Sequence, residues 1–209
     1  MTSTLRAAVS AMRRSHAPRR RQRGALAVEA ALALPILLGV GMIGADMQRI
    51  HSERIRVENA AGAMALNLAA QPALTAGGVD ALARLAMQGH EDMQQLIILN
   101  VLESGRIAWA LQRGGASDLC DAPASGGQYT GTLPQDRPDT GASNVDNSTM
   151  SMIVVKACRD TADISLWAGM PLPDLLETAA VFRATSRNIR LDETLRAESV
   201  ASGLAYAEP

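Results

Sequence analysis

Residues 23–45 read RGALAVEAALALPILLGVGMIGA, and this stretch determines how the rest of the chain is interpreted. After the arginine, residues 25–45 carry a single charge, that of Glu29. At about 1.5 Å of rise per residue, a helix of this length is roughly 30 Å long, which matches the hydrocarbon core of a bilayer. We therefore expect a transmembrane helix at residues 25–45.

The charge before this segment predicts its orientation. Residues 1–24 hold seven arginines and no acidic residue, and removing these seven charges from the formal net charge of −1 leaves −8 for residues 25–209. Arginines placed just before an apolar run keep that end in the cytoplasm, so everything after Asp46 is expected on the other side. The acidic body argues against nucleic-acid binding.

A secretory signal peptide is the alternative for the same segment. Such a signal has a shorter apolar region of about 7 to 15 residues followed by a small-x-small cleavage site. Alanine-rich triplets occur throughout residues 25–45, so this alternative stays open.

Two residues inside the apolar segment are candidate functional positions. An ionisable side chain in a membrane helix costs about 2.5–3.5 kcal/mol at the bilayer centre, so Glu29 either extends to the headgroups or has a specific function. Pro35 removes the helical hydrogen bond to Ala31, which predicts a kink or local loosening.

A motif of about 40 residues supports the functional alternative. It consists of Gly24, Glu29, the pair Leu34-Pro35, and the triplet 59–61, which reads Asn-Ala-Ala. With these elements the chain resembles the TadE-like family of minor pilins and pseudopilins of the tight-adherence (Tad/Flp) pilus system. It departs from the family pattern at Ala30, where an aromatic residue is frequent.

The resemblance implies cleavage and assembly. A prepilin peptidase would cut between Gly24 and Ala25, and the new amine of Ala25 would pair with Glu29, four residues on and on the same side of the helix, setting axial register. The implied fold class is α+β and pilin-like, with a long N-terminal transmembrane helix continuing into a small antiparallel β-sheet domain. The implied location is the bacterial inner membrane, single-pass, with the C-terminal domain periplasmic, or the pilus itself.

The resemblance also implies partners. Besides the prepilin peptidase and the lipid bilayer, these are other Tad minor pilins or pseudopilins, the major Flp pilin, and the inner-membrane assembly platform. The function expected is participation in the initiation, priming or capping of a Flp-type pilus.

The remaining pattern predicts the domain organisation. The expected segments are a basic leader at 1–24, the transmembrane helix at 25–45, a polar continuation of that helix at 46–71, a small α+β domain at 72–188 with a flexible loop at 114–149, and a tail at 189–209. A stripe of residues at helical spacing, broken at Arg54, is expected to pack on the protein's own sheet. This stripe comprises Met47, Ile50, Arg54, Val57, Ala61, Met64 and Leu68.

Within the α+β domain the sequence predicts local pairings. A β-hairpin around Ser104-Gly105 would place Ile98, Asn100 and Leu102 opposite Leu111, Trp109 and Ile107, with Glu103 opposite Arg106. Trp109 would then lie in the core. Strands are expected at 150–158 and 178–187, and a second helical patch would bury Val79, Leu82, Leu85 and Ala86 on one face.

The two cysteines predict a disulfide. Cys120 falls in the long loop and Cys158 at the end of a strand, and an even cysteine count in an exported domain favours pairing. Free thiols are the alternative.

Residues for catalysis or for a cofactor are few. Residues 39–44 spell G-x-G-x-x-G, but no strand precedes them and no βαβ alternation follows, so we expect small residues for helix packing rather than a nucleotide site. His51 and His90 lack the partners of known zinc motifs. With 2% aromatic residues a roomy enzyme cleft is not expected either.

No cofactor or metal is expected. Two function classes compete with the pilin-like one: an uncleaved membrane-anchored periplasmic scaffold or adhesion protein, and an exported enzyme.

Overall fold

The computed structural model describes residues 19–134, 151–169, 171–186 and 188–205, with side chains from Ala27 onward in the first helix. The chain divides into two compact units. The first contains the residues up to Gln48 together with Leu166–Met170, and the second contains Arg49–Ser165 and the residues from Pro171 onward.

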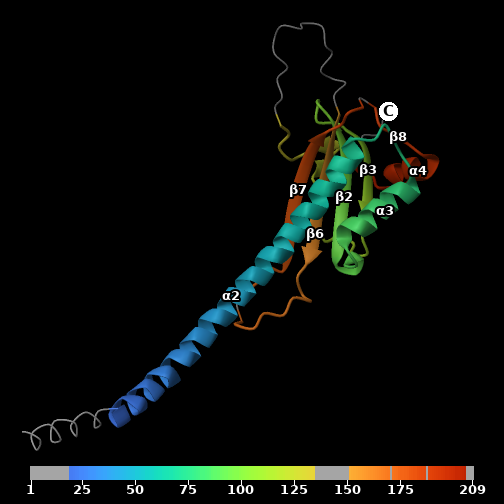
Figure 1. Cartoon of the computed structure of the whole chain (residues 1–209). Coiled ribbons are helices and arrows are strands. Elements are labelled where there is room, and N and C mark those ends of the chain that lie inside the picture. Colours follow the sequence, from blue (N-terminus) through green and yellow to red (C-terminus); the bar gives the residue numbers. More distant parts are fainter. Residues whose placement is uncertain (1–18, 135–150, 170, 187, 206–209) are drawn as a thin grey trace, which may run out of the picture. The chain divides into compact units, whose positions relative to one another are not determined.

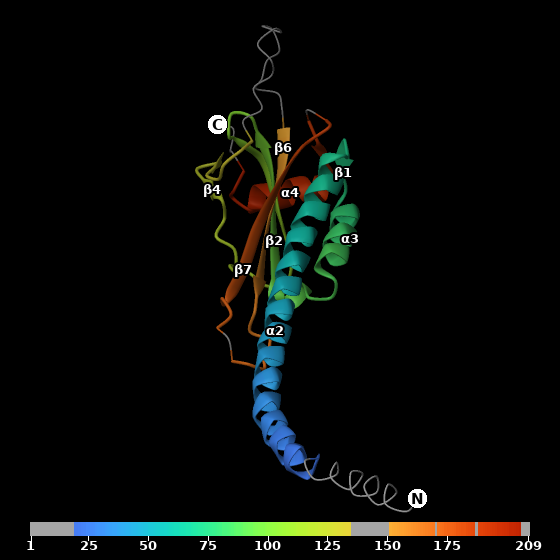
Figure 2. The same cartoon turned by 60° about the vertical axis from the view of Figure 1, so that its left-hand side comes forward.

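Helix α2, Arg19–Ala69, belongs to both units. It is one uninterrupted helix (Figure 2). Pro35 lies inside it. It ends at Ala69, three positions before Pro72 and two before the expected end of the helix at residue 71. Residues 25–45 of α2 are strongly apolar, whereas the part from Arg49 carries charged residues on one side and buried residues on the other.

The second unit is built on a four-stranded antiparallel sheet in the order β3-β2-β6-β7 (Figure 1). Its strands are β2 (Gln94–Leu102), β3 (Ile107–Arg113), β6 (Ser151–Asp160) and β7 (Leu175–Arg183). The two central strands, β2 and β6, are the most continuously buried, because both faces of the sheet are covered.

Alternate residues of these strands enter two separate hydrophobic clusters, as the two-residue period of a strand requires. One face, bearing Ile98, Trp109 and Val155, packs against α2 and against α3, Ala76–Met87. The other face, bearing Leu99 and Val154, packs against the segment around Cys120. The expected stripe on α2 therefore does face the protein's own sheet, through Val57, Ala61, Met64 and Leu68, whereas Met47 and Arg54 are exposed.

The segment expected as a tail is part of the fold. Strand β8, Arg190–Leu191, pairs in parallel with β1, Ala73–Leu74, and helix α4, Glu193–Ala201, follows. Ile189 and Leu195 are buried in the same cluster as α2 and α3. The boundary at residue 188 was therefore wrong, because the burial of Ile189 and Leu195 depends on a cluster that they share with residues of α2 and α3, far earlier in the chain.

The hairpin has the expected partners near its open end and different ones near its turn. Ile98 pairs with Leu111 and Asn100 with Trp109, but Val101, rather than Leu102, pairs with Ile107. The register shifts between Asn100 and Val101, so one residue of β3 is left without an opposite partner.

The turn of this hairpin starts earlier than expected. The N–H of Gly105 donates to the carbonyl of Leu102, which places Glu103 inside the turn rather than opposite Arg106. Gly105 has a φ of +82°, a left-handed conformation that glycine adopts without strain.

Three further expectations need correction. Leu85 is 74% exposed, because the buried face of α3 carries Val79, Ala83 and Met87 at helical spacing instead. The last long strand occupies Leu175–Arg183 and not 178–187.

The described part of the 114–149 loop holds a small hairpin, β4 (Ala124–Ser125) with β5 (Gln128–Tyr129), while residues 135–149 lie outside the described residues. A short 3₁₀ helix, η2 (Glu91–Met93), precedes β2.

Candidate functional site

The first candidate site is the apolar part of α2. In the described part of the chain, α2 from Ala27 onward is long and apolar enough to cross a membrane, and its most apolar stretch is not buried within the protein. Its large side chains are exposed all round the helix, and they are Val28, Leu32, Leu34, Ile36, Leu37, Leu38, Val40, Met42 and Ile43. A helix that is apolar all round requires lipid or another protein surface around it.

All four predicted residues of the N-terminal segment lie on this one helix. Gly24 and Ala25 are helical, and Glu29 follows one turn later with an exposed side chain. Glu29 is four positions after Ala25, so both positions fall on the same side of α2. Pro35 lies inside the helix, which continues through it, and the kink stays a prediction.

At the polar end of the apolar segment the structure shows a contact that the sequence did not predict. The carboxylate of Asp46 is 2% exposed and accepts two backbone hydrogen bonds, from the N–H of Trp167 to Oδ1 at 2.9 Å and from the N–H of Ala168 to Oδ2 at 2.6 Å. All three residues belong to the first unit. Hydrogen bonds to an ionised acceptor are among the stronger ones in proteins, so Asp46 fixes this loop to the helix.

The predicted disulfide is confirmed. Cys120 and Cys158 are bonded, with 5.6 Å between their Cα atoms, and the disulfide covers the face of the sheet opposite α2. The buried Gln95 on β2 supports it, because its Oε1 accepts from the N–H groups of Leu119 and Cys120 at 2.8 and 2.7 Å. The disulfide thus joins the long loop to β6, and the hydrogen bonds of Gln95 join the same loop to β2.

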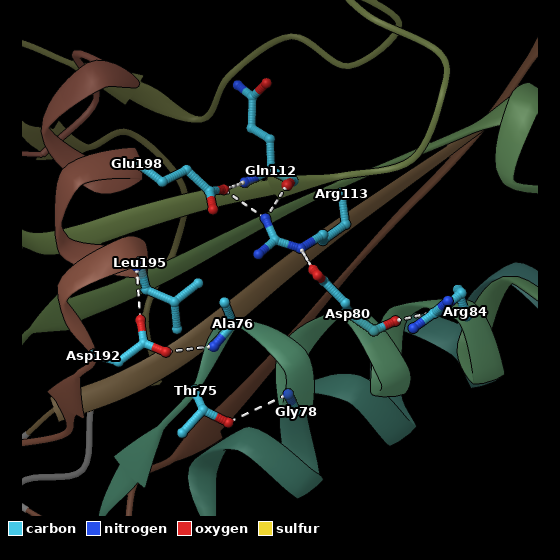
Figure 3. A network of polar contacts seen from close by, with 10 residues as sticks. All are labelled: Thr75, Ala76, Gly78, Asp80, Arg84, Gln112, Arg113, Asp192, Leu195 and Glu198. Atoms are coloured by element: carbon cyan, nitrogen blue, oxygen red, sulfur yellow. Dashed lines mark hydrogen bonds and ion pairs between the residues drawn. The ribbon is translucent and has the colours of Figure 1, made fainter.

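A polar network joins α3, β3 and α4 (Figure 3). The guanidinium of Arg113 on β3 forms ion pairs with Asp80 on α3 at 2.6 Å and with Glu198 on α4 at 2.5 Å. Burial alone would lower the pKa of Arg113, but the hydrogen bonds and charges of these two carboxylates outweigh it and raise the pKa above its ordinary value. Arg113 therefore stays charged and holds both helices against the edge of the sheet.

In the same network Asp192 serves two helices (Figure 3). Its Oδ1 accepts from the N–H of Leu195, capping α4, and its Oδ2 accepts from the N–H of Ala76 at the start of α3. Donors from the two backbones favour the ionised form and lower the pKa of Asp192. One carboxylate thereby joins the C-terminal segment to the beginning of the domain.

A buried ion cluster lies where α2 meets the end of β6. Arg159 is 1% exposed, its Nε lies 3.6 Å from Oε2 of Glu53 on α2, and its Nη2 bonds Asp163 at 3.0 Å. Glu53 also bonds Arg56 at 2.8 Å. The second half of α2 is thus held to the sheet by charge as well as by apolar packing.

Among the described residues, no group of three or more His, Cys, Asp or Glu side chains is arranged to hold a metal ion. Residues 39–44, with the G-x-G-x-x-G spacing, lie inside α2, where no phosphate-binding turn exists.

Comparison with known proteins adds no assignment: no protein-family description, curated protein or solved structure matches this chain. The likeness to TadE-like proteins therefore rests on the motif of residues 24–61 alone.

Proposed function

We propose that the protein is a minor pilin or pseudopilin-like subunit that takes part in the initiation, priming or capping of a Tad/Flp-type pilus. The observation that carries this proposal is an apolar helix, exposed on all sides, with the Gly24 to Glu29 motif at its N-terminal end. In this role the helix lies in the inner membrane before assembly and among the helices of neighbouring subunits afterwards, so its apolar surface is covered at each stage.

Glu29 gives the motif a physical function in this proposal. Cleavage after Gly24 creates a positively charged amine at Ala25, which the Glu29 carboxylate pairs with in its own or a neighbouring subunit. In surroundings of low dielectric constant an unpaired charge is costly, so one axial register between helices is favoured over the others.

The small domain suits a structural subunit rather than an enzyme. Its sheet is covered on both faces and its charged residues join secondary-structure elements to one another, as Arg113 and Arg159 do. The proposed partners are a prepilin peptidase, other minor pilins or pseudopilins and the major Flp pilin, and the assembly platform of the inner membrane.

One observation favours a second candidate, an uncleaved membrane-anchored scaffold of the periplasm. Helix α2 begins at Arg19 and is helical on both sides of Gly24. Proteases act preferentially on exposed, non-helical segments, so a continuous helix across the bond disfavours cleavage.

N-terminal sequencing and intact mass of the protein from native membranes distinguish the two. A mature chain that starts at Ala25 supports the pilin-like function, and replacing Gly24 with leucine should abolish that start because a bulky side chain then occupies the cleavage site. Gly39→Leu is the matched control, since a Cβ at Gly39 meets no atom within 4 Å. A start at Met1 would favour the scaffold, and a cut beyond Ala45 would indicate a signal peptide.

A further inference from the structure

We propose that the loop around Trp167 is a membrane-contact element, which places the indole of Trp167 in the headgroup region of the bilayer in which α2 is inserted. The inference goes beyond pilus assembly and requires only that the apolar part of α2 lies in a membrane. It rests on the position of Asp46, on the hydrogen bonds that Asp46 accepts, and on the exposure of Trp167.

Asp46 marks the membrane boundary on α2. It is the first charged residue after Glu29, and the apolar run that it ends is about as long as the hydrocarbon core is thick. A carboxylate at this position therefore lies where acyl chains give way to headgroups.

The loop is held at this same level. The N–H groups of Trp167 and Ala168 lie 2.9 and 2.6 Å from the Asp46 oxygens, although the residues are more than 120 positions apart in sequence. On the loop's other side, within the second unit, Arg49 donates to the carbonyl of Ser165 at 3.2 Å. Trp167 thus starts from a backbone position fixed at the boundary.

The exposed side chains of the loop suit a lipid interface. Trp167 is 69% exposed, Ala168 and Gly169 are also exposed, and residues 166–169 include no charged residue. Tryptophan is enriched at membrane interfaces because its ring is apolar and its N–H remains able to bond polar headgroups. The other tryptophan, Trp109, is buried in the domain core and has no such access.

The contact also explains why a buried carboxylate is present at this position. The two backbone donors satisfy the charge of Asp46 and close the loop over it, so the helix presents an aromatic rather than an acidic surface to the membrane. The loop acts as an anchor that sets the depth of the helix, in addition to its length and apolar character.

Depth-dependent fluorescence quenching tests the proposal on the full chain. The protein is reconstituted into phosphatidylcholine and phosphatidylglycerol vesicles that contain lipid brominated either near the glycerol end or near the middle of the acyl chain. Wild type is compared with Trp167→Phe, which leaves Trp109 as the reporter, and with Trp167→Phe/Leu37→Trp, which reports insertion of α2. We expect wild type to be quenched mainly by the shallow bromines, Trp167→Phe to lose that quenching, and the Leu37→Trp reporter to be quenched mainly by the deep ones.

Asp46→Asn tests whether the carboxylate positions the loop. The amide retains one acceptor oxygen and loses the charge, so shallow quenching of Trp167 should weaken while quenching of a Leu37→Trp reporter stays the same. Unchanged quenching in Asp46→Asn would show that the two hydrogen bonds do not position the loop.

The outcomes distinguish contact of Trp167 with the bilayer from insertion of α2. A quenched Leu37→Trp reporter with an unquenched Trp167 overturns the membrane contact while leaving insertion of α2 in place, and it is also the result expected if Trp167 packs on a second protein. If neither reporter is quenched, α2 is not inserted and the proposal fails with it. Neither result depends on cleavage at Gly24 or on assembly of a pilus, so the proposed function is tested separately.

Discussion

Ser199 of helix α4 accepts a hydrogen bond from the backbone N–H of Ala110 on strand β3, at 3.0 Å. Strand β3 is an edge of the sheet, and the backbone N–H of Ala110 points away from the neighbouring strand β2. The next such donor, the N–H of Gln112, is taken by Oε1 of Glu198. Helix α4 therefore covers one edge of the sheet, which protects it from pairing with other chains.

Ser199→Ala is predicted to destabilise the domain by about 1–3 kcal/mol, because the buried N–H of Ala110 loses its acceptor. Thr194→Ala, at an exposed position of the same helix, is the control and should change the free energy of unfolding by about 0.5 kcal/mol or less. Denaturant unfolding of the full chain in detergent, followed by tryptophan fluorescence, measures both. If Ser199→Ala and Thr194→Ala had the same free energy of unfolding, the hydrogen bond from Ala110 to Ser199 would not stabilise this edge.

Glu53→Gln should cost about 3 kcal/mol, since it leaves the buried guanidinium of Arg159 without its partner on α2. Glu58→Gln, which removes an exposed ion pair with Arg54 on the same helix, is the control and should cost about 1 kcal/mol or less. The same unfolding measurement applies, and a Glu53 variant no weaker than the Glu58 variant would contradict the structural role of the cluster.

Removal of the disulfide is predicted to destabilise the domain by about 4 kcal/mol in the chain-entropy estimate, because Cys120 and Cys158 close a loop with a sequence separation of 38. The double variant Cys120→Ser/Cys158→Ser should melt about 10 °C lower than wild type by calorimetry. Wild type treated with reductant should approach the melting temperature of the variant. Maleimide labelling of both cysteines in unreduced protein from the oxidising compartment would count against the bond.

The stability of the domain should fall in acid partly through Asp192. Because the folded state lowers the pKa of this group, its contribution is complete above its ordinary pKa of about 3.9 and is lost as the pH falls through the lower folded value. Asp192→Asn should therefore be less stable than wild type at pH 6 and should lose less stability between about pH 5 and pH 2. Glu193→Gln, at the exposed neighbouring residue, is the control, and a pH profile of Asp192→Asn parallel to that of wild type would contradict the assignment.

Glu29→Ala is predicted to leave membrane insertion and cleavage after Gly24 intact while reducing piliation by at least about tenfold, because the new amine of Ala25 loses its partner. Glu58→Ala makes the same substitution at an exposed site of α2 and should assemble normally. Electron microscopy of cells, with mass spectrometry of the membrane protein, separates assembly from processing. Normal piliation with Glu29→Ala would remove the proposed role of this carboxylate but not the pilin-like function.

Sequence alone determined the features that a short stretch of residues, or the residue composition, makes visible. Residues 25–45 contain one charge and fill the length of a membrane helix, so the apolar segment of α2 was predictable. The apolar run of residues 96–102, the turn residues Ser104-Gly105 and the strand pattern after them predicted the hairpin of β2 and β3, and the even cysteine count predicted the disulfide. These signals need no knowledge of which distant segments meet.

The tertiary structure alone decided the contacts between distant residues that have no periodic signal. Asp46 meets the backbone of Trp167, Arg159 is buried against Glu53, and Ser199 covers β3, all across more than 85 residues of sequence. A single aspartate, arginine or serine has the same local pattern whether it faces solvent or a backbone donor. Its role is set by which elements the topology brings together, because hydrogen bonds and ion pairs depend on distance in space and not on position in the chain.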